Sequence, residues 1–366
     1  DIFWFYDKLT KADTVDGGDG FDAVGVDSGD YSTAGAAAAL NALTTIEQIR
    51  FYASGLDVKV NGATLTNPAI TSLLTDGLGN NFDVTNARDA WSYTFRHFTN
   101  DAAITLTDQA TTFDITMSGD QGLQHVAGDG DYAQINNLRL NLSAVAPASA
   151  VATVNIDSGG DLAAGVHNDI NNLYVKVGST INITGDADLN LYNINPATFG
   201  EHVTVDASTF TGNLLMMGTD QINGVLATGD VIKLGSGSDT VRVNANSSGF
   251  TDAATMDLKT DTIVGFQAGA GGDVLDHLGA DYTYTAMSAT GQAAIDALGS
   301  GTTLQIAADT ATANITATTE WTAFTFQGHT YAFFNGDGNA TFDTGVDTLV
   351  ELVGVQVADL TGANFL

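Results

Sequence analysis

Short runs in which apolar and polar residues alternate recur along most of the chain. The clearest are ITLT, FDITM, LRLNL, TINIT, LNLYNI and VTVD, at residues 104–107, 113–117, 138–142, 180–184, 189–194 and 203–206. Threonine, valine and isoleucine dominate these runs, and glycine, asparagine and aspartate separate them. A period of two in such residues is typical of short β-strands joined by tight turns. The pattern therefore predicts an all-β protein.

One stretch departs from this alternation. The segment STAGAAAALNALTTIEQIRF, which begins at Ser32, has the alanine and leucine content of a helix of two or three turns. A strand near Ile46 to Phe51 should follow it. We therefore expect one short helix, near the N-terminus of the sequence.

Two pairs of similar segments indicate an internal repeat. INNLRLNL from Ile135 resembles INNLYVKV from Ile170, and NIDSGGDL from Asn155 resembles NITGDADL from Asn182. The second pair is offset by the length of three nonapeptides. Repeated strand–turn units favour a β-solenoid, or parallel β-roll, over a sandwich. A β-sandwich stays open as the alternative for residues 56–150.

The charge balance narrows the classes of function. The chain has 43 acidic and 11 basic residues, so its formal net charge is −32, and it has no cysteine. Nucleic-acid binding is excluded because no basic surface could displace counterions from phosphate. Disulfides and thiolate zinc sites are excluded as well, and no apolar run is long enough to span a bilayer. The acids could serve solubility or high salt, but aspartates beside glycine and asparagine suit calcium.

The stretch TVDGGDGFDAVGV, residues 14–26, contains the nonapeptide pattern GGxGxDx followed by an apolar residue. This pattern is the calcium-binding repeat of RTX proteins. Gly18 and Gly20 would allow a tight turn and expose backbone carbonyls, while Asp22 would close the cation site. Asp13 lies nine positions before Asp22, so two stacked turns could share an ion. An ordinary glycine turn is the alternative.

Further acidic turns follow the same logic. TGDVIKLGSGSDTVRV and DTIVGFQAGAGGDVLDHLG supply a second group of candidate ligands, with Leu234 in place of the first glycine. Those candidates are Asp230, Gly235, Gly237, Asp239, Asp261, Asp273 and Asp276. In AGDGDY, Asp129 and Asp131 are weaker candidates, since a plain surface turn explains them equally well.

Near the end, FFNGDGNATFDTGVDTLVEL has oxygen-bearing side chains at alternate positions, which resembles the start of an EF-hand loop. The candidate ligands are Asn335, Asp337, Asn339, Asp343 and Asp347. Val346 stands where an EF-hand has its bidentate glutamate. We therefore expect a calcium loop of another kind, with a structural turn as the alternative.

These motifs together carry a resemblance to a family. Residues 228–366 resemble the C-terminal part of an RTX protein exported by type I secretion. DTIVGFQAGAGGDVLD is similar to the segment that closes RTX calcium blocks, and residues 347–366 are similar to the tails of such substrates. Upstream, VNIDSGGDL, NITGDADLNL and TVDASTFTGNL resemble repeats of RTX-type surface-layer proteins and RTX adhesins. Long uninterrupted nonapeptide arrays, as in RTX toxins and proteases, are missing.

The resemblance implies a secreted protein that reads an uncleaved C-terminal signal and folds outside the cell on meeting calcium. The missing Sec leader and the lack of cysteine agree with it. The expected fold is an all-β, calcium-binding β-solenoid or parallel β-roll. Its expected parts are residues 1–55 (RTX-like turn with a helix–strand unit), 56–220 (repetitive solenoid), 221–290 (calcium-binding β-roll) and 291–366 (C-terminal domain with the export signal).

Enzyme motifs are missing from the sequence. It has neither HExxH nor GxSxG, and its six histidines are scattered without metal-ligand spacing. We therefore expect no enzyme. A surface-layer subunit comes first, an RTX adhesin or matrix fibre second, and an RTX hydrolase a distant third. The expected cofactor is calcium, and the expected partners are copies of the chain and cell-surface polysaccharide bound through a region outside it.

Overall fold

The computed structural model describes most of the chain, and every structural statement below concerns that part. The described residues are 1–52, 55–77, 80–89, 91–106, 112–120, 132–140, 153–162, 165–175, 178–196, 202–217, 229–243, 256–278, 282–313, 315, 320–343 and 346–366. The chain forms two compact units. The N-terminal unit comprises Asp1–Lys176 with Thr184–Tyr192, and the C-terminal unit comprises Val177–Ile183 with Asn193–Leu366.

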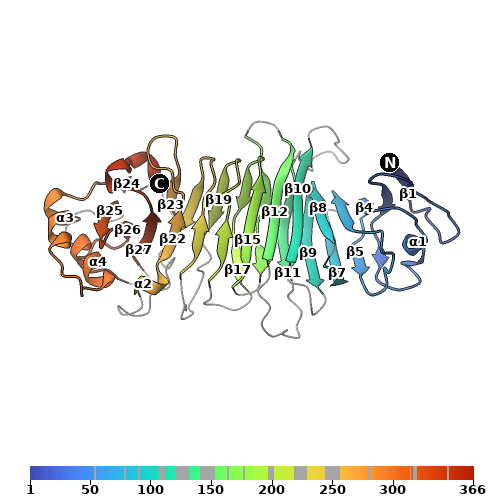
Figure 1. Cartoon of the computed structure of the whole chain (residues 1–366), viewed down its shortest axis with the longest axis horizontal. Helices are drawn as coiled ribbons and strands as arrows, with labels where there is room; N and C mark the ends of the chain where they lie inside the picture. The colour runs from blue at the N-terminus through green and yellow to red at the C-terminus, as the bar shows by residue number, and fades with distance from the viewer. Residues whose placement is uncertain are drawn as a thin grey trace. The chain divides into compact units, whose positions relative to one another are not determined.

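The N-terminal unit is built from two parallel sheets between which the chain alternates (Figure 1). The first sheet contains, in spatial order, β1 (Ile2–Tyr6), β2 (Ala23–Asp27), β4 (Gln48–Tyr52), β6 (Ser72–Asp76), β8 (Ser92–Arg96), β10 (Thr112–Asp120) and β12 (Thr153–Asp161). The second contains β3 (Asp30–Tyr31), β5 (Val58–Asn61), β7 (Asn81–Ala87), β9 (Phe98–Leu106), β11 (Gln134–Leu140), β13 (Asn168–Ile170) and β16 (Leu189–Leu191), with β14 (Leu173–Val175) also on β11. The predicted parallel β-roll is therefore confirmed in its architecture.

Each coil of this roll is longer than a nonapeptide. Contacts between neighbouring coils join residues 21 positions apart at Trp91 and Ile70, and 41 positions apart at Asn155 and Asp114. Residues that stack on one another therefore come from sequence positions far beyond a nine-residue step.

Both predicted repeats correspond to neighbouring coils. Ile135 pairs with Ile170 and Leu138 with Leu173, in register across the parallel ladder. In the second repeat, the hydroxyl of Thr184 donates to Asp157 Oδ1, 27 positions away. The offset expected to be three nonapeptides is thus a single coil.

Aromatic side chains fill the space between the two sheets of the N-terminal unit. Phe51 and Phe82 lie with ring centroids 6.0 Å apart, and Phe82 meets Phe95 edge-on at 6.0 Å. All three are fully buried. Because successive strand residues point to opposite faces, the alternation seen in the sequence places one apolar set in this core.

The predicted helix after Ser32 is shorter than expected. The α-helix α1 covers only Ala38–Asn41, and the strand β4 follows as predicted. The amide nitrogen of Asn67 donates to the carbonyls of Leu40 and Leu43, at 3.2 and 2.8 Å. Those carbonyls would serve the next helical turn, so the neighbouring coil ends the helix.

The C-terminal unit also contains parallel strands, and it has an antiparallel part as well. Its first strand series contains the beginning of β15 (Thr180–Gly185), then β18 (Thr204–Asp206), β20 (Val231–Lys233), β22 (Asp261–Val264), β27 (Thr348–Val353), β26 (His329–Asn335), β25 (Glu320–Phe326) and β24 (Thr283–Tyr284). Its second series contains β19 (Leu214–Met217), β21 (Thr240–Val243) and β23 (Val274–His277); β17 is Ile194–Pro196. Strand β26 pairs antiparallel with both β25 and β27.

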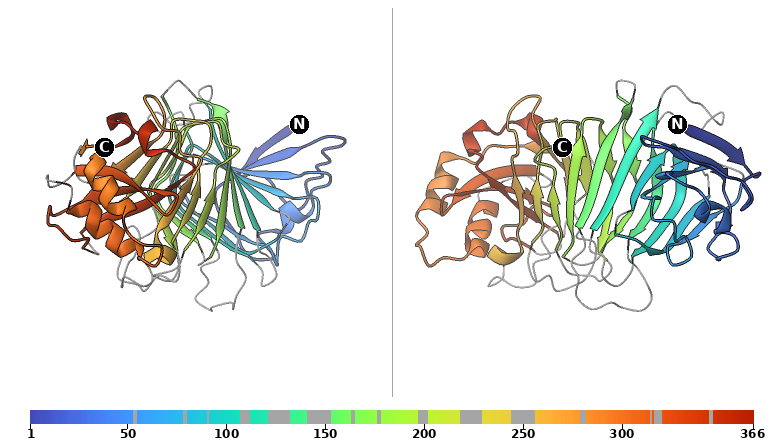
Figure 2. Two further views of the ribbon diagram at one scale, coloured as in Figure 1. Left: turned by 60° about the vertical axis from the view of Figure 1, so that its left-hand side comes forward. Right: turned by 45° about the vertical axis from the view of Figure 1, so that its right-hand side comes forward.

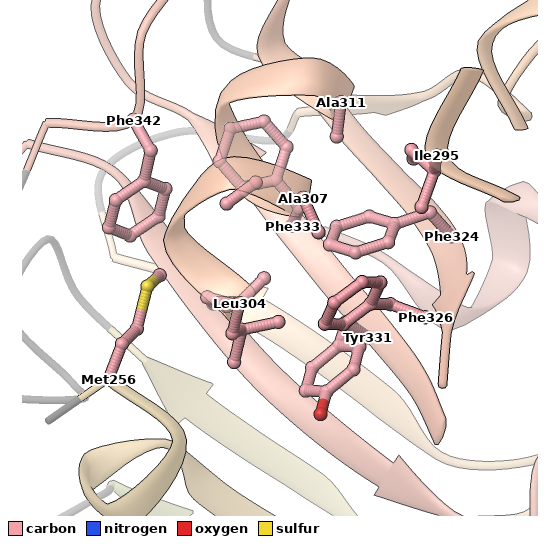
Figure 3. Packing of buried hydrophobic residues seen from close by; sticks show 12 residues of the cluster. Met256, Ile295, Leu304, Ala307, Ala311, Phe324, Phe326, Tyr331, Phe333 and Phe342 are labelled. Carbon is pink, nitrogen blue, oxygen red and sulfur yellow. The ribbon is translucent and has the colours of Figure 1, made fainter. Parts of the chain in front are cut away.

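Three further α-helices correct the expectation of a single helix, all in the C-terminal unit: α2 (Met256–Lys259), α3 (Ala289–Asp296) and α4 (Leu304–Thr312). The short 3₁₀ helices η1 (Val357–Asp359) and η2 (Gly362–Asn364) follow β27. Figure 3 shows α4 placing Leu304, Ala307 and Ala311 against the aromatic side chains of the β25–β26 hairpin. Among the described residues, no helix is both long and apolar enough to cross a membrane.

Candidate metal-binding turns

The first glycine-rich turn has the backbone that its sequence predicts. A Cβ atom on Gly17 would lie 2.2 Å from the carbonyl oxygen of Thr45, so the turn passes against the next coil. Gly18 and Gly20 adopt φ angles of 83° and 120°, which strain residues that carry a side chain. The three glycines therefore hold Asp22 at the start of β2.

Asp22 is buried in this turn, with 1% of its surface exposed. Its Oδ1 accepts a hydrogen bond from the nitrogen of Asp1 at 2.6 Å. Its Oδ2 is buried and accepts no hydrogen bond from the described residues. The carboxylate of Glu47 lies at the same place, since its Oε2 accepts from the backbone nitrogen of Asp22 at 2.8 Å. An unpartnered carboxylate oxygen beside a second carboxylate suits a hard cation.

Asp13 does not stack on Asp22 as the nine-residue spacing predicts. The residue that meets Asp22 from the following coil is Glu47, 25 positions further on. Asp13 is partly exposed in the connection that leads to Asp22, and its Oδ2 accepts from the nitrogen and hydroxyl of Thr10 at 2.7 and 2.9 Å. Sequence reasoning missed Glu47 because the coil length, which sets its register, was unknown.

In the C-terminal unit, four candidate aspartates are buried and bonded to backbone; we call them the carboxylate ladder. They are Asp230, Asp239, Asp261 and Asp273. On one side, Oδ1 of Asp230 accepts from the nitrogen of Val203, and Oδ1 of Asp261 accepts from the nitrogen of Asp230, both at 2.8 Å. Each carboxylate therefore bonds the backbone of the preceding coil.

The other two aspartates of the ladder, Asp239 and Asp273, each accept two backbone hydrogen bonds. Asp239 accepts from the nitrogens of Leu214 and Gly235, at 2.9 and 3.1 Å. Asp273 accepts from the nitrogens of Asp239 and Gln267, at 2.8 and 2.7 Å. Both oxygens of each carboxylate thus have a backbone donor. Nine residues separate Asp230 from Asp239, and they lie in different strand series.

The sequence predicts that the backbone carbonyls of Gly235 and Gly237 bind a cation, but in the structure a side-chain amide donates to both. The side-chain nitrogen of Gln267 lies 3.1 Å from the carbonyl oxygen of Gly235 and 3.3 Å from that of Gly237. Each glycine is needed for close stacking, because a Cβ on either would come within 2.2 Å of the preceding coil's backbone, at Phe210 or Gly212. An amide therefore lies where the sequence predicts a metal ion.

Asn364 ends the ladder beyond Asp273. Its side-chain nitrogen donates to the carbonyl of Asp273 at 2.8 Å, and its Oδ1 accepts from the nitrogen of Gly269 at 2.9 Å. Asp276 has a different role, since its Oδ2 accepts from Nε of Arg242 at 2.8 Å. Burial raises the pKa of Asp273 to about 6, although two backbone donors lower it.

The acidic loop, residues 335–343 with 346–347, contains the carboxylates of Asp337, Asp343 and Asp347. Asp347 is buried and accepts from the nitrogens of Gly336 and Asp343, both at 2.8 Å. The side-chain nitrogen of Asn339 donates to the carboxylates of both Asp337 and Asp343. Burial, with the charges of Asp337 and Asp343 adding to it, raises the pKa of Asp347 to about 6. The site therefore carries more negative charge than its own donors offset.

Asn335 and helix α4 hold this loop in place. The side-chain oxygen of Asn335 accepts from the nitrogen of Gly338 at 2.6 Å. On α4, Asp309 accepts from the nitrogen of Phe342 at 2.8 Å, and Gln305 donates to the Phe342 carbonyl at 3.2 Å. The loop is thus fixed at both sides, while Asp337 stays exposed and Asp343 partly exposed.

Two of the predicted sites keep the features of a cation site, namely the Asp22–Glu47 turn and the acidic loop. Asp129 and Asp131 lie outside the described residues. Within the described ranges, no three His, Cys, Asp or Glu side chains are grouped so as to hold a metal ion. Calcium takes six to eight oxygens, so an ion at either place would also need backbone carbonyl or water oxygens.

Comparison with known proteins finds no match for this chain among family models, curated proteins or solved structures. The resemblance of its motifs to RTX proteins therefore remains an interpretation of the sequence.

Proposed function

We propose that this chain is a structural protein of the bacterial cell surface. It is a surface-layer subunit that leaves the cell by type I secretion, folds in calcium and assembles with copies of itself into a two-dimensional lattice. A stack of parallel coils supports this proposal, because repeating coils form extended surfaces at which copies of the chain could meet. The motifs of residues 228–366 support secretion and calcium.

The observation that carries the calcium part is the carboxylate of Asp22. Its Oδ2 is buried without a hydrogen bond from the described residues, and the carboxylate of Glu47 accepts from the backbone nitrogen of the same residue. Leaving such an oxygen without a partner is costly in a protein interior. Ca²⁺ would bridge the two carboxylates, and so link consecutive coils of the N-terminal unit.

Charge supports a role for calcium in assembly. With a net charge of −32, copies of the chain repel one another at neutral pH. Each bound Ca²⁺ cancels two negative charges, and its binding energy adds to the free energy of unfolding. Extracellular calcium modules bind with Kd on the order of 10⁻⁴ to 10⁻³ M. Sites of this strength are empty inside a cell and filled outside.

An RTX adhesin or matrix fibre is the second candidate, since long parallel rolls also form stalks. The two differ in assembly: a lattice needs several contacts that close into a sheet, whereas a stalk needs none. A hydrolase stays the third candidate, because the sequence has no hydrolase motif. His277 is unsuited to catalysis, since it is buried and stacks on Phe334 with ring centroids 3.9 Å apart.

A calcium titration of the chelated full-length chain tests the proposal. We expect circular dichroism to report a gain of β-structure and light scattering to report assembly, both between about 10⁻⁴ and 10⁻² M calcium. Electron microscopy at the end point should show sheets; fibres would favour the adhesin.

Magnesium at equal concentrations is the matched control, because it dehydrates reluctantly and demands a stricter geometry. It should restore neither signal fully. Complete β-structure and intact assemblies in excess chelator would refute the proposal.

A further inference from the structure

A polar cluster lies on the outward face of the second sheet in the N-terminal unit. The strands of this unit, coloured from blue to green in Figure 2, lie side by side in both views. In the parallel register, Asp169 of β13 stands next to Asn190 of β16. Their strand neighbours Ile170 and Leu189 are fully buried, and successive residues of a strand point to opposite faces. The two polar side chains therefore point away from the core.

Both side chains are nevertheless almost covered. Asp169 is 6% and Asn190 8% exposed, although aspartate and asparagine are mostly exposed in proteins. Three rings lie around them. Tyr132, which precedes β11, lies with its ring centroid 6.2 Å from that of His167, and Tyr192 follows β16 directly. We call these five residues the Asp169 cluster.

The carboxylate of Asp169 is the centre of the cluster. Its Oδ1 accepts a hydrogen bond from the amide nitrogen of Asn190 at 2.9 Å and lies 3.4 Å from Nε2 of His167. Burial raises the pKa of Asp169, although His167 and Asn190 lower it. Burial, with the charge of Asp169 adding to it, also raises the pKa of Tyr132. The phenol of Tyr132 therefore lies near the same carboxylate.

Backbone contacts hold the cluster in place. The nitrogen of Asp169 donates to the carbonyl of Ala133, and the nitrogen of Tyr192 donates to that of Ile170, at 2.8 and 3.1 Å. The buried side chain of Asn168 accepts from the nitrogen of Ala133 at 3.1 Å. The residues before β11 and after β16 are thus tied to β13, which fixes both tyrosines beside the carboxylate. A site whose groups are already in place loses less entropy on binding a ligand.

The mixture of groups indicates the chemistry of a ligand. The amide nitrogen of Asn190 donates to Asp169 and, at 3.2 Å, to the hydroxyl of Tyr192, so its side-chain oxygen and the carboxylate can accept. The imidazole and the phenols can donate. Hydroxyl groups both donate and accept, so a ligand with several hydroxyls matches the cluster. The tyrosine rings add apolar faces for C–H groups.

Other classes of ligand fit the cluster less well. An anion would be repelled by Asp169 and by the net charge of −32. A metal ion would find no group of three His, Cys, Asp or Glu side chains among the residues that the structure describes. An organic cation needs acceptors alone, so it would leave the donors of the imidazole and the phenols unmatched.

We propose that the Asp169 cluster binds a neutral saccharide. Asp169 and the side-chain oxygen of Asn190 accept hydrogen bonds from adjacent hydroxyls of one sugar ring, and His167 donates to a further hydroxyl. The rings of Tyr132 and Tyr192 pack on C–H groups of the same sugar. This inference goes beyond the proposed function, which needs no ligand on this face and places polysaccharide binding outside the chain.

Saturation-transfer difference NMR tests the proposal, because it detects weak binding. One sugar ring has about a dozen non-hydrogen atoms and should bind with Kd on the order of 10⁻³ M. The full chain in calcium is mixed with methyl glycosides of glucose, galactose, mannose, N-acetylglucosamine, rhamnose and fucose, and with methyl glucuronide as an anionic probe. At least one neutral glycoside should give signals, and the glucuronide should give none. Silence from all six neutral probes, or a stronger signal from the glucuronide, would overturn the proposal.

Three variants locate the binding site. Asp169→Asn keeps the shape of the side chain, removes its charge and should weaken binding about ten-fold or more. Tyr132→Ala removes a partly exposed ring and should weaken binding about ten-fold. Tyr174→Ala removes a partly exposed ring at the other end of β11, where Tyr174 pairs with Arg139, and should leave binding unchanged. Equal effects of the two tyrosine substitutions would contradict binding at the cluster, and so would unchanged binding in Asp169→Asn.

The saccharide experiment and the calcium titration fail separately. Saccharide signals from a chain that does not assemble in calcium would refute the proposed function alone. Assembly in calcium without saccharide signals would refute this inference alone. Assembly of Asp169→Asn in calcium, with its saccharide signals lost, is the outcome that supports both.

Discussion

Two turns with nearly the same sequence pattern differ in what their aspartate meets. In the N-terminal unit, Asp22 closes a GGxGxD turn and keeps a buried oxygen without a hydrogen bond. In the C-terminal unit, Asp239 closes a GxGxD turn, and both of its oxygens accept backbone hydrogen bonds. The glycines set the shape of each turn, whereas the neighbouring coils decide the partner of the carboxylate.

The difference teaches that the motif alone does not define a metal site. Backbone N–H donors favour the anionic form of a carboxylate, although burial outweighs them at Asp273. We therefore distinguish three arrangements among the predicted calcium ligands. The carboxylate ladder bonds neighbouring coils, the Asp22–Glu47 turn has an oxygen without a hydrogen bond, and the acidic loop has an exposed carboxylate, Asp337, near that of Asp347.

The largest effect should come from Asp239→Ala. The substitution leaves the buried nitrogen of Leu214 without its acceptor, at a cost of about 1–3 kcal/mol, and the partly buried nitrogen of Gly235, at a smaller cost. Urea unfolding should show this loss, while calorimetry should show an unchanged number of calcium ions. The same substitution at Asp276, in an ion pair with the partly exposed Arg242, should cost less than about 1 kcal/mol. Loss of an ion with unchanged stability would make Asp239 a metal ligand.

The pH dependence of the metal-free protein should follow next in size. Burial raises the pKa of Asp273 and Asp347 to about 6 from an ordinary 3.8. Because the pKa of each carboxyl is higher in the folded than in the unfolded state, the contribution of the pair to the free energy of unfolding is greatest below about pH 4. It falls as pH rises through 6. Melting temperature in chelator should therefore drop between pH 4 and pH 6 relative to that of a double Asp→Asn variant.

His277 acts in the opposite sense, because burial lowers its pKa to about 4 from 6.5. His277 therefore lowers the stability of the fold as pH falls from about 6.5 to 4. Wild type and the double Asp→Asn variant both contain His277, so its effect cancels when the two are compared. Calcium should abolish the loss assigned to Asp347 and leave that of Asp273, if only the acidic loop binds an ion. Identical pH profiles for wild type and the double variant would show that the ionisation of Asp273 and Asp347 does not affect stability.

Asp22→Ala should change calcium binding more than stability. It removes the oxygen that has no hydrogen bond together with Oδ1, which pairs with the nitrogen of the exposed Asp1. Because an ion pair with an exposed partner contributes little, the metal-free protein should lose only about 1 kcal/mol. The number of bound calcium ions should fall by one, and Glu47→Gln should weaken the same ion. Asp13→Ala, in the exposed connection before this turn, serves as the control and should leave the count unchanged. An unchanged number of bound calcium ions in Asp22→Ala would contradict the assignment of Asp22 as a calcium ligand.

The smallest effect should come from Gly18→Ala. The φ angle of Gly18 is 83° and the space around a new Cβ is open, so only backbone strain of about 1 kcal/mol is expected. Gly18→Asn should cost less, because asparagine tolerates this conformation better. Thermal unfolding distinguishes the two; equal losses would indicate that something other than the φ angle matters at this turn.

Much of the fold could be predicted because it depends on local patterns. Alternation located β10, β11, β15 and β18, and the INNL repeat predicted which strands lie side by side. The helix α4 was missed although Leu304, Ala307, Ala308 and Ala311 follow a helical period. Its face consists mainly of alanines, whose small side chains gave little hydrophobic contrast, and threonines obscured it further.

The partners of the candidate ligands could not be predicted in the same way. Glu47 meets Asp22 from 25 positions away, and Asp273 meets Asp239 from 34. These distances depend on the lengths of the connections, which vary from coil to coil. A fixed nine-residue step therefore placed Asp13 on Asp22 incorrectly, and it could not reveal that Gln267 donates to Gly235 and Gly237.

Four hydrogen bonds of the carboxylate ladder run from a backbone nitrogen of an earlier coil to a side chain of a later one. These coils should therefore fold more readily in one order along the chain than in the reverse order. The hairpin β25–β26 turns tightly at Gln327 and Gly328, and such local pairing forms faster than contacts that close loops of twenty or more residues. We expect folding to nucleate there. When a coil nearer the N-terminus then folds, its backbone nitrogens meet carboxylates of the next coil that are already in position to accept their hydrogen bonds.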